Sequence, residues 1–221
     1  MKLRRRLLFY KLNKKKIYFT HALLMTSKKY KLSFTAASLS INEAVNIAEV
    51  YLKMRDWNQT NLYIKENNTL QSRTSSRTIR VSRELIQRLK MLTDTQIELL
   101  VEGNPTEKKY LLWLAACKTY EFVKEFAIEV LHEKYLSRSM TLTDLDYDAF
   151  FNRKSDWNDD LAQITTSTRK KIRQVLLLMA KEAGLLTEDN TILRAMLSNR
   201  LTGTLKSDAP MSFQIFPIEP I

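Results

Sequence analysis

Glycine is nearly absent from this chain, which has only 3 glycines and 4 prolines among its 221 residues. Tight β-turns depend on these residue types, so a sandwich or barrel built from many hairpins is disfavoured. A Gly-rich phosphate loop or a dinucleotide fingerprint needs several glycines close together and is excluded. Because 44% of the residues are hydrophobic, the chain can still bury a sizeable core. We therefore expect a mainly α-helical fold.

Helix start signals follow one another along the sequence. Ser40–Glu43 has the pattern of a capping box, Asp56 can cap a short helix, and Thr93–Gln96 opens another. Asn104–Glu107 combines a capping residue, a proline at the first helical position and a glutamate at the third. No helix breaker follows until about Ser137, so the sequence predicts one continuous helix there.

The residues from Tyr110 to Cys117 are apolar at every position. A helix that is hydrophobic on all sides is surrounded by other helices. Trp113, Phe122, Phe126 and Val130 are therefore expected in the core. Cys117 is expected to be a buried, unreactive thiol. As the only cysteine it forms no internal disulfide, which fits a reducing cytoplasm.

The charge pattern changes near residue 140, where we expect a domain boundary. We divide the chain into a basic leader, an N-terminal helical domain, a C-terminal domain and an extended or docked tail: 1–24, 25–139, 140–206 and 207–221. The sequence of the C-terminal domain predicts three helices, at 147–151, 156–164 and 168–183, followed by a hairpin at 185–193. This order is that of a winged helix-turn-helix.

Positive charge is concentrated in the leader. The formal net charge is +12, and residues 1–24 hold 8 Lys and Arg and no acidic residue. The leader has no apolar stretch of signal-peptide length, and no run in the chain approaches the ~18 apolar residues of a membrane span. Three interpretations of the leader remain open. It is a nucleic-acid-binding arm, an amphipathic segment on a membrane surface, or a disordered tail or misassigned start.

Two further basic clusters are candidate nucleic-acid sites. The first follows a helix expected at about 76–92, with Arg77, Arg80 and Arg88 on one side and leucines on the other. Its full set is Arg73, Arg77, Arg80, Arg83, Arg88 and Lys90. Arginine and neighbouring hydroxyl side chains are typical phosphate contacts. A solvated face, or pairing with the acidic stretch 144–160, is the alternative.

The second cluster is Arg169, Lys170, Lys171 and Arg173, at the start of the longest predicted C-terminal helix. Recognition helices insert their N-terminal residues into the major groove, so this is the end where DNA contacts are expected. Cations at a helix N-terminus are unfavourable unless an anion compensates them. A surface cluster without a ligand is the alternative.

Enzymatic signals are weak. The sequence has no paired-His metal motif, no G-x-S-x-G and no Cys/His cluster. Asp144, Asp146 and Asp148 alternate as in a calcium loop, but the required glycine and final glutamate are missing. We therefore expect no catalytic residue, metal, cofactor or small-molecule substrate.

Segments spread over the chain resemble the BrxA proteins of bacterial BREX (bacteriophage exclusion) systems. The resemblance runs from about Tyr30 to Leu205. It rests on Trp57, Glu66–Asn67 with Leu70–Arg73, RVSRELIQRLKML (80–92), LLWLAACKTYEFVKEFAIEVL (111–131) and STRKKIRQVLLLMAKEAGLL (167–186). It implies an N-terminal part similar to the NusB antitermination fold, joined by a short linker to a winged-helix part. Family members are described as binding double-stranded DNA beside a methyltransferase, an ATPase and other BREX components.

Together, these observations predict a cytoplasmic, non-enzymatic protein that binds double-stranded DNA, mainly through phosphates, in phage defence. One alternative is an assembly scaffold whose basic faces meet acidic BREX proteins. Another is an RNA-binding protein, by analogy with NusB.

Overall fold

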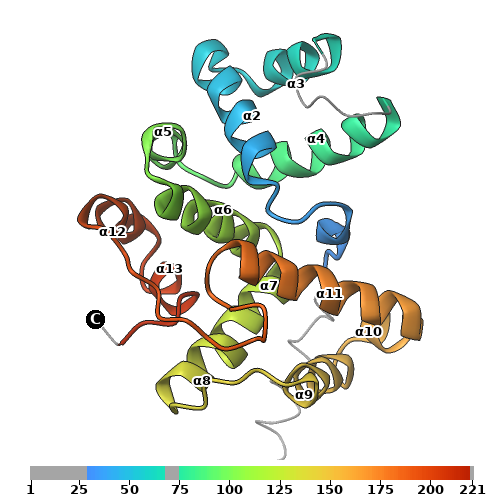
Figure 1. Cartoon of the computed structure of the whole chain (residues 1–221). Coiled ribbons are helices and arrows are strands. Elements are labelled where there is room, and N and C mark those ends of the chain that lie inside the picture. Colours follow the sequence, from blue (N-terminus) through green and yellow to red (C-terminus); the bar gives the residue numbers. More distant parts are fainter. Residues whose placement is uncertain (1–28, 68–74, 220–221) are drawn as a thin grey trace, which may run out of the picture.

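The computed structural model of the protein describes residues 29–67 and 75–219, without the side chains of residues 75–78 (Figure 1). The basic leader at 1–24 lies outside the described residues. Within them the fold is helical: no β-strand forms, and two isolated antiparallel bridges are the only extended pairings. The expectation of a mainly α-helical fold is confirmed.

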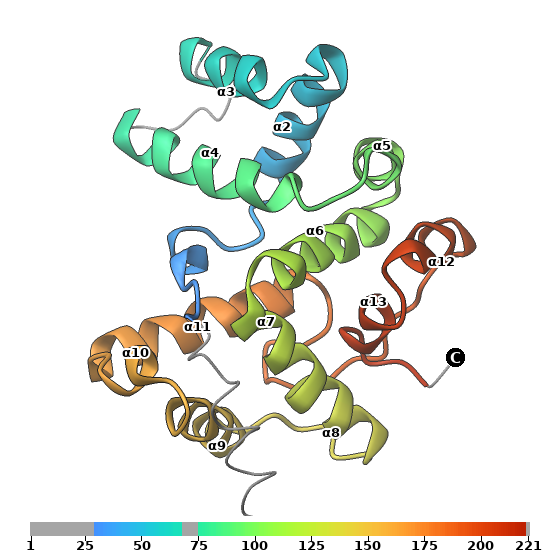
Figure 2. The ribbon, with the colours of Figure 1, turned by 180° about the vertical axis from the view of Figure 1, so that it is seen from behind.

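The N-terminal helices form the upper part of the molecule in Figure 1. They are α2 (Ile41–Met54), α3 (Trp57–Glu66), α4 (Ser75–Leu89) and α5 (Asp94–Glu102). The short helix η1 (Ser33–Ala36) precedes them and lies below α4 in that view. Helices α3 and α4 run in opposite directions and lie side by side in both views (Figures 1 and 2).

Most of the predicted helix starts are confirmed by their hydrogen bonds. The side chain of Asp56 accepts bonds from two backbone N–H groups of α3, and reciprocal capping boxes form at Thr93 and Asn104. Ser40 is the exception. It has a left-handed backbone (φ 50°) and its side chain caps nothing, although α2 begins directly after it. The helix was correctly predicted there, but the capping box was not.

The prediction of one continuous helix from Asn104 to about Ser137 is wrong, because the helix is interrupted at Tyr120. The structure has α6 (Pro105–Thr119), α7 (Glu121–Phe126), the π-helical η2 (Ala127–His132) and α8 (Glu133–Leu136). Tyr120 has an extended backbone (φ −122°, ψ 107°) and a fully buried ring whose hydroxyl donates to the Glu84 carboxylate. That partner lies 36 residues away, so local helical periodicity carries no sign of the break.

The C-terminal elements are α9 (Asp144–Ser155), α10 (Asp159–Ala162), α11 (Thr166–Glu182), α12 (Asn199–Leu205), η3 (Lys206–Asp208) and α13 (Met211–Gln214). The helix expected at 168–183 is α11, and Gly184 follows it with a positive φ of 73°. The expected hairpin also forms: Leu186 bridges Ile192, and the N–H of Leu193 donates to the carbonyl of Leu185 at 2.9 Å.

The tail after residue 206 is docked and partly helical, so the extended alternative is wrong. It contains most of η3 and all of α13. The indole N–H of Trp113 donates to the Ile215 carbonyl at 3.0 Å, and Nδ1 of His132 lies 2.7 Å from the Phe216 carbonyl. These bonds hold the tail against α6 and η2.

One continuous hydrophobic core runs through both halves of the described chain. Trp113, Phe122, Phe126 and Val130 are buried, as predicted. Phe150 of α9 packs edge-on against both phenylalanines, with ring centroids 5.1 and 5.5 Å apart. The parts on either side of residue 140 therefore share a core, and their division into two domains stays a prediction. No helix in the described ranges combines the length and the apolar content needed to cross a bilayer.

Candidate nucleic-acid interface

Helix α4 and the turn after it carry three exposed cations, Arg80, Arg83 and Lys90. Within the described part of the chain, their side chains make no hydrogen bond or ion pair. This distinguishes them from cations such as Arg55, whose guanidinium lies 2.9 Å from the Glu98 carboxylate. Three of the residues predicted for the first cluster therefore present uncompensated charge to solvent.

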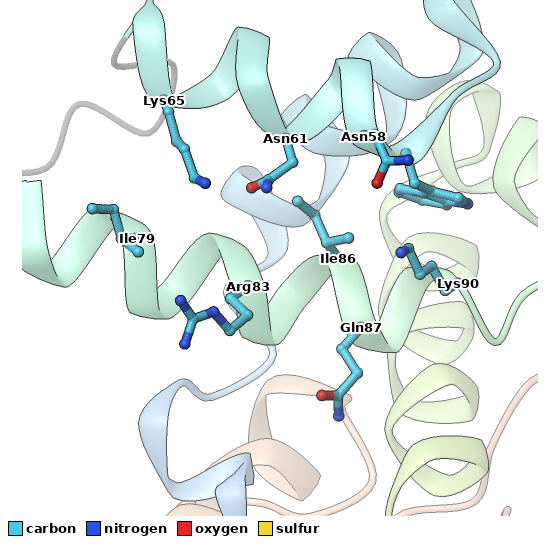
Figure 3. Close-up of a pocket in the computed structure, with 9 residues that line it drawn as sticks. Asn58, Asn61, Lys65, Ile79, Arg83, Ile86, Gln87 and Lys90 are labelled. Carbon is cyan, nitrogen blue, oxygen red and sulfur yellow. The ribbon is translucent and has the colours of Figure 1, made fainter.

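A groove of about 340 Å³ separates α4 from α3. Helix α3 contributes three side chains that the charge pattern of the sequence did not indicate: Asn58, Asn61 and Lys65. They are spaced three and four residues apart, so they share one face of α3, and Figure 3 shows them pointing toward α4. The spacing was visible in the sequence, but which helix faces α3 was not. We call Lys65, Arg80, Arg83 and Lys90 the α3–α4 basic face.

Arg88 does not belong to this face, and the expectation that it lies exposed beside Arg80 is wrong. Only 2% of its surface is accessible. Its guanidinium donates to the backbone carbonyls of Ser38 (2.5 Å) and Ala37 (2.7 Å) and pairs with Glu84 at 3.2 Å. The stripe of α4 that carries Arg88 is covered by the segment around η1, a tertiary contact that helical spacing cannot predict.

The Arg88 site is a structural clamp. Burial lowers the pKa of its guanidinium from the ordinary value, and the neighbouring Glu84 carboxylate counteracts this effect. The clamped segment is also held from the other half of the molecule, because the N–H of Leu39 donates to the Glu182 carboxylate of α11 at 2.6 Å. Arg88 thus fixes the position of α4 relative to the rest of the fold.

Two predicted residues cannot be placed. Arg73 lies outside the described residues, and Arg77 lies on α4 with its side chain outside the description. Both stay predictions.

The second cluster lies on α11 and is half neutralised by acidic residues of α9. Arg169 approaches the Asp148 carboxylate at 2.6 Å, and its guanidinium lies over the Phe151 ring. Arg173 pairs with Asp144 at 3.0 Å. The sequence suggested that an external anion compensates these charges, but internal carboxylates already do so for both arginines.

Lys170 and Lys171 differ from these arginines. Both are exposed, and within the described residues neither side chain has an ion-pair partner. Lys170 lines a second cavity of about 330 Å³ beside Tyr147. Burial raises the pKa of the Tyr147 hydroxyl well above its ordinary value, so this phenol stays neutral at physiological pH. The α11 cluster therefore offers two available cations.

The Cys117 thiol and the Asp146 carboxylate both lie in structural environments. Cys117 is fully buried, which raises the pKa of its thiol and disfavours the reactive thiolate. Asp146 closes a capping box with Thr143 and also binds Lys134 at 2.9 Å. No group of three or more His, Cys, Asp or Glu side chains among the described residues is arranged to hold a metal ion.

Comparison with known proteins identifies the family. A family model described as BrxA matches residues 28–209. The chain belongs to the BrxA family. The BREX protein BrxA of Bacillus cereus (strain H3081.97) is 31% identical over 119 residues, which cover 54% of this chain and 60% of that relative. The match thus spans three-fifths of the relative's length.

The fold also occurs in a solved structure. A crystal structure of an uncharacterized protein from Magnetospirillum magneticum superposes with a TM-score of 0.75 at 18% identity, covering 86% of this chain and 99% of that one. At this identity the likeness concerns the fold alone. Both basic regions lie inside the stretch that matches the BrxA family.

Proposed function

We propose that this chain is a non-enzymatic component of a BREX phage-defence system that binds double-stranded DNA mainly through phosphate contacts. The observation that carries the proposal is a set of exposed cations that have no partner among residues 29–67 and 75–219: Lys65, Arg80, Arg83, Lys90, Lys170 and Lys171. Uncompensated cations on a helix surface are the usual electrostatic footprint of phosphate binding.

The defence role rests on the family. The B. cereus relative carries the name of a BREX protein, and this chain belongs to the same family. We infer that its partners include other BREX components, such as a methyltransferase and an ATPase, and that it works in the cytoplasm.

The arrangement of the two basic regions supports binding of one continuous duplex to both of them. The N-terminal ends of α4 and α11 lie at the same edge of the molecule (Figure 1). We propose that α9, α10, α11 and the hairpin at 185–193 act as a winged helix-turn-helix, with α11 toward the major groove. The helices before them form the NusB-like part, whose α3–α4 basic face meets the flanking phosphates.

A salt-titrated binding assay tests the proposal. If these six cations displace counterions from DNA, the logarithm of the binding constant should fall linearly with the logarithm of the salt concentration. The slope should be about −5 for duplexes of any sequence. An affinity that does not change with salt would contradict phosphate binding. Structured RNA should compete poorly, because A-form grooves do not admit a recognition helix.

A second candidate function is an assembly scaffold. Three large apolar side chains are strongly exposed: Leu145 (78%), Trp157 (75%) and Met196 (68%). Apolar surface of this kind is typical of protein contacts when it gathers in a patch. Capture of BREX proteins that survives nuclease and high salt, and is lost in Trp157→Ser, would favour this function over DNA binding.

A further inference from the structure

The groove between α3 and α4 has features that binding of DNA phosphates alone does not require. Phosphates of a duplex can be held by cations on a convex helix surface, with no concavity. Here the cations border a cavity of about 340 Å³, a size within the roughly 300–1,000 Å³ range of small-ligand pockets. No carboxylate is among its lining residues.

Several polar side chains converge on this groove. Facing helices normally pack apolar side chains against each other, but α3 directs two amides and an ammonium group at α4 (Figure 3). Among the described residues, the side chains of Asn58, Asn61 and Lys65 make no hydrogen bond or ion pair. Arg83 and Lys90, which line the opposite side, are also unpaired. The groove therefore offers donors, acceptors and positive charge together.

The groove also has an apolar wall. Ile86 is buried at its base, and Ile79 lies at its edge with 38% of its surface accessible. Trp57 is stacked on Tyr51, with ring centroids 3.9 Å apart and an angle of 14° between the planes, so its indole is held in place. A ligand matching this lining has a flat, mostly apolar body, hydrogen-bonding edges and negative charge.

We propose that the α3–α4 groove binds one unstacked nucleotide of a DNA strand, an inference that rests on the proposed DNA-binding function. The base packs against Ile79 and Ile86, and its edge meets the amides of Asn58 and Asn61. The flanking phosphates meet Lys65, Arg83 and Lys90. Asparagine amides suit this role because each supplies both a donor and an acceptor to a base edge.

This arrangement makes the protein selective for DNA structure. Extruding a paired base costs a few kcal/mol, whereas an unpaired base is already available. The chain should therefore bind a duplex with a single-nucleotide bulge at least about tenfold more tightly than the continuous duplex.

Binding of the full chain to two matched duplexes tests the inference, one continuous and one with a single bulged nucleotide. Asn61→Ala should abolish the preference for the bulge, because it removes an amide that meets the base edge and changes no charge. Alanine also favours helix, so α3 should persist. Gln59→Ala is the matched control, since Gln59 is exposed on the same helix but does not line the groove. A photoreactive 5-iodouracil at the bulge should crosslink to the peptide that contains Trp57.

Each outcome bears on a different proposal. Equal affinities for the two duplexes overturn the nucleotide site and leave duplex binding intact. A bulge preference that Asn61→Ala retains also overturns it, because the preference then reflects bending of the DNA. Binding of the bulged duplex alone supports the groove and overturns duplex binding, and binding of neither overturns both. Tighter binding of dAMP than of the bulged duplex, lost in Asn61→Ala, would overturn the assignment to a strand.

Discussion

On the α3–α4 basic face, four cations lie exposed with no acidic partner in the described part of the chain, whereas at the start of α11 both arginines lie against carboxylates of α9. The two regions look alike in the sequence, as arginines and lysines on a helix beside hydroxyl residues. The folded protein neutralises one of them and not the other. Because DNA must compete with Asp148 and Asp144 for the α11 arginines, equal numbers of cations do not give equal phosphate affinity.

The largest expected effect is on DNA affinity when the α3–α4 basic face is neutralised. Replacing Lys65, Arg80, Arg83 and Lys90 with Gln should weaken duplex binding by about 10³- to 10⁴-fold near 0.1 M salt, since each cation contributes about −0.9 to the salt slope. Fluorescence anisotropy with labelled duplexes over a salt range measures both quantities.

A double variant elsewhere on the surface is the control for that loss. Lys53 and Lys206 are exposed and, within the described residues, unpaired. Lys53→Gln with Lys206→Gln should cost far less affinity per charge removed. Equal losses per charge would show that net charge, and not the α3–α4 basic face, determines the affinity.

The next effect separates Arg88 from the other cations of α4. Arg88→Ala leaves Glu84 buried without its cation and three backbone carbonyls without their donor. We expect a loss of about 3–5 kcal/mol in the free energy of unfolding. Arg83→Ala on the same helix should change it by less than about 0.5 kcal/mol. Urea denaturation compares the two variants. A similarly small change in the free energy of unfolding in both would contradict the structural role of Arg88.

The contrast between Arg83 and Arg88 also shows how far the sequence could be used to predict the structure. Helix positions and the polar character of α4 follow from spacing and start signals, which are local. The burial of Arg88 follows from the segment around η1, 50 residues away in the chain. The helix break at Tyr120 likewise coincides with a tertiary contact, the hydrogen bond from its hydroxyl to Glu84, which lies 36 residues away. Local patterns therefore predicted helices such as α3, α4, α5 and α11, but not the break at Tyr120 or which polar face of a helix turns inward.

The candidate site shows the same limit. Arg83 and Lys90 were predicted from charge on their own helix. Lys65, Asn58 and Asn61 were not, because their relevance depends on α3 lying beside α4. On α11 the charges were found correctly, but the pairing with α9 could not be deduced from either helix alone.

Smaller effects are expected from the α11 cluster. Lys170→Gln with Lys171→Gln removes its two unpaired cations and should lower duplex affinity by about 10- to 100-fold near 0.1 M salt, with a slope change of about 1.8. The same anisotropy titration measures this. A loss as large as that from the α3–α4 basic face would reverse the ranking of the two regions. If the affinity does not fall, α11 does not belong to the DNA interface, and its proposed role as a recognition helix is contradicted.

The smallest effect tests whether α9 is what distinguishes the two regions. Asp144→Asn with Asp148→Asn leaves Arg169 and Arg173 without their carboxylates, so duplex affinity should rise by about tenfold and the salt slope should steepen. The stability loss should stay within about 1 kcal/mol per pair, because the Asp144 carboxylate is largely exposed and that of Asp148 is partly exposed. Asp156→Asn is the control, since it removes a nearby exposed acid that pairs with neither arginine. If the double variant gains no more affinity than this control, the guanidinium groups do not reach DNA, and α11 contributes through its lysines alone.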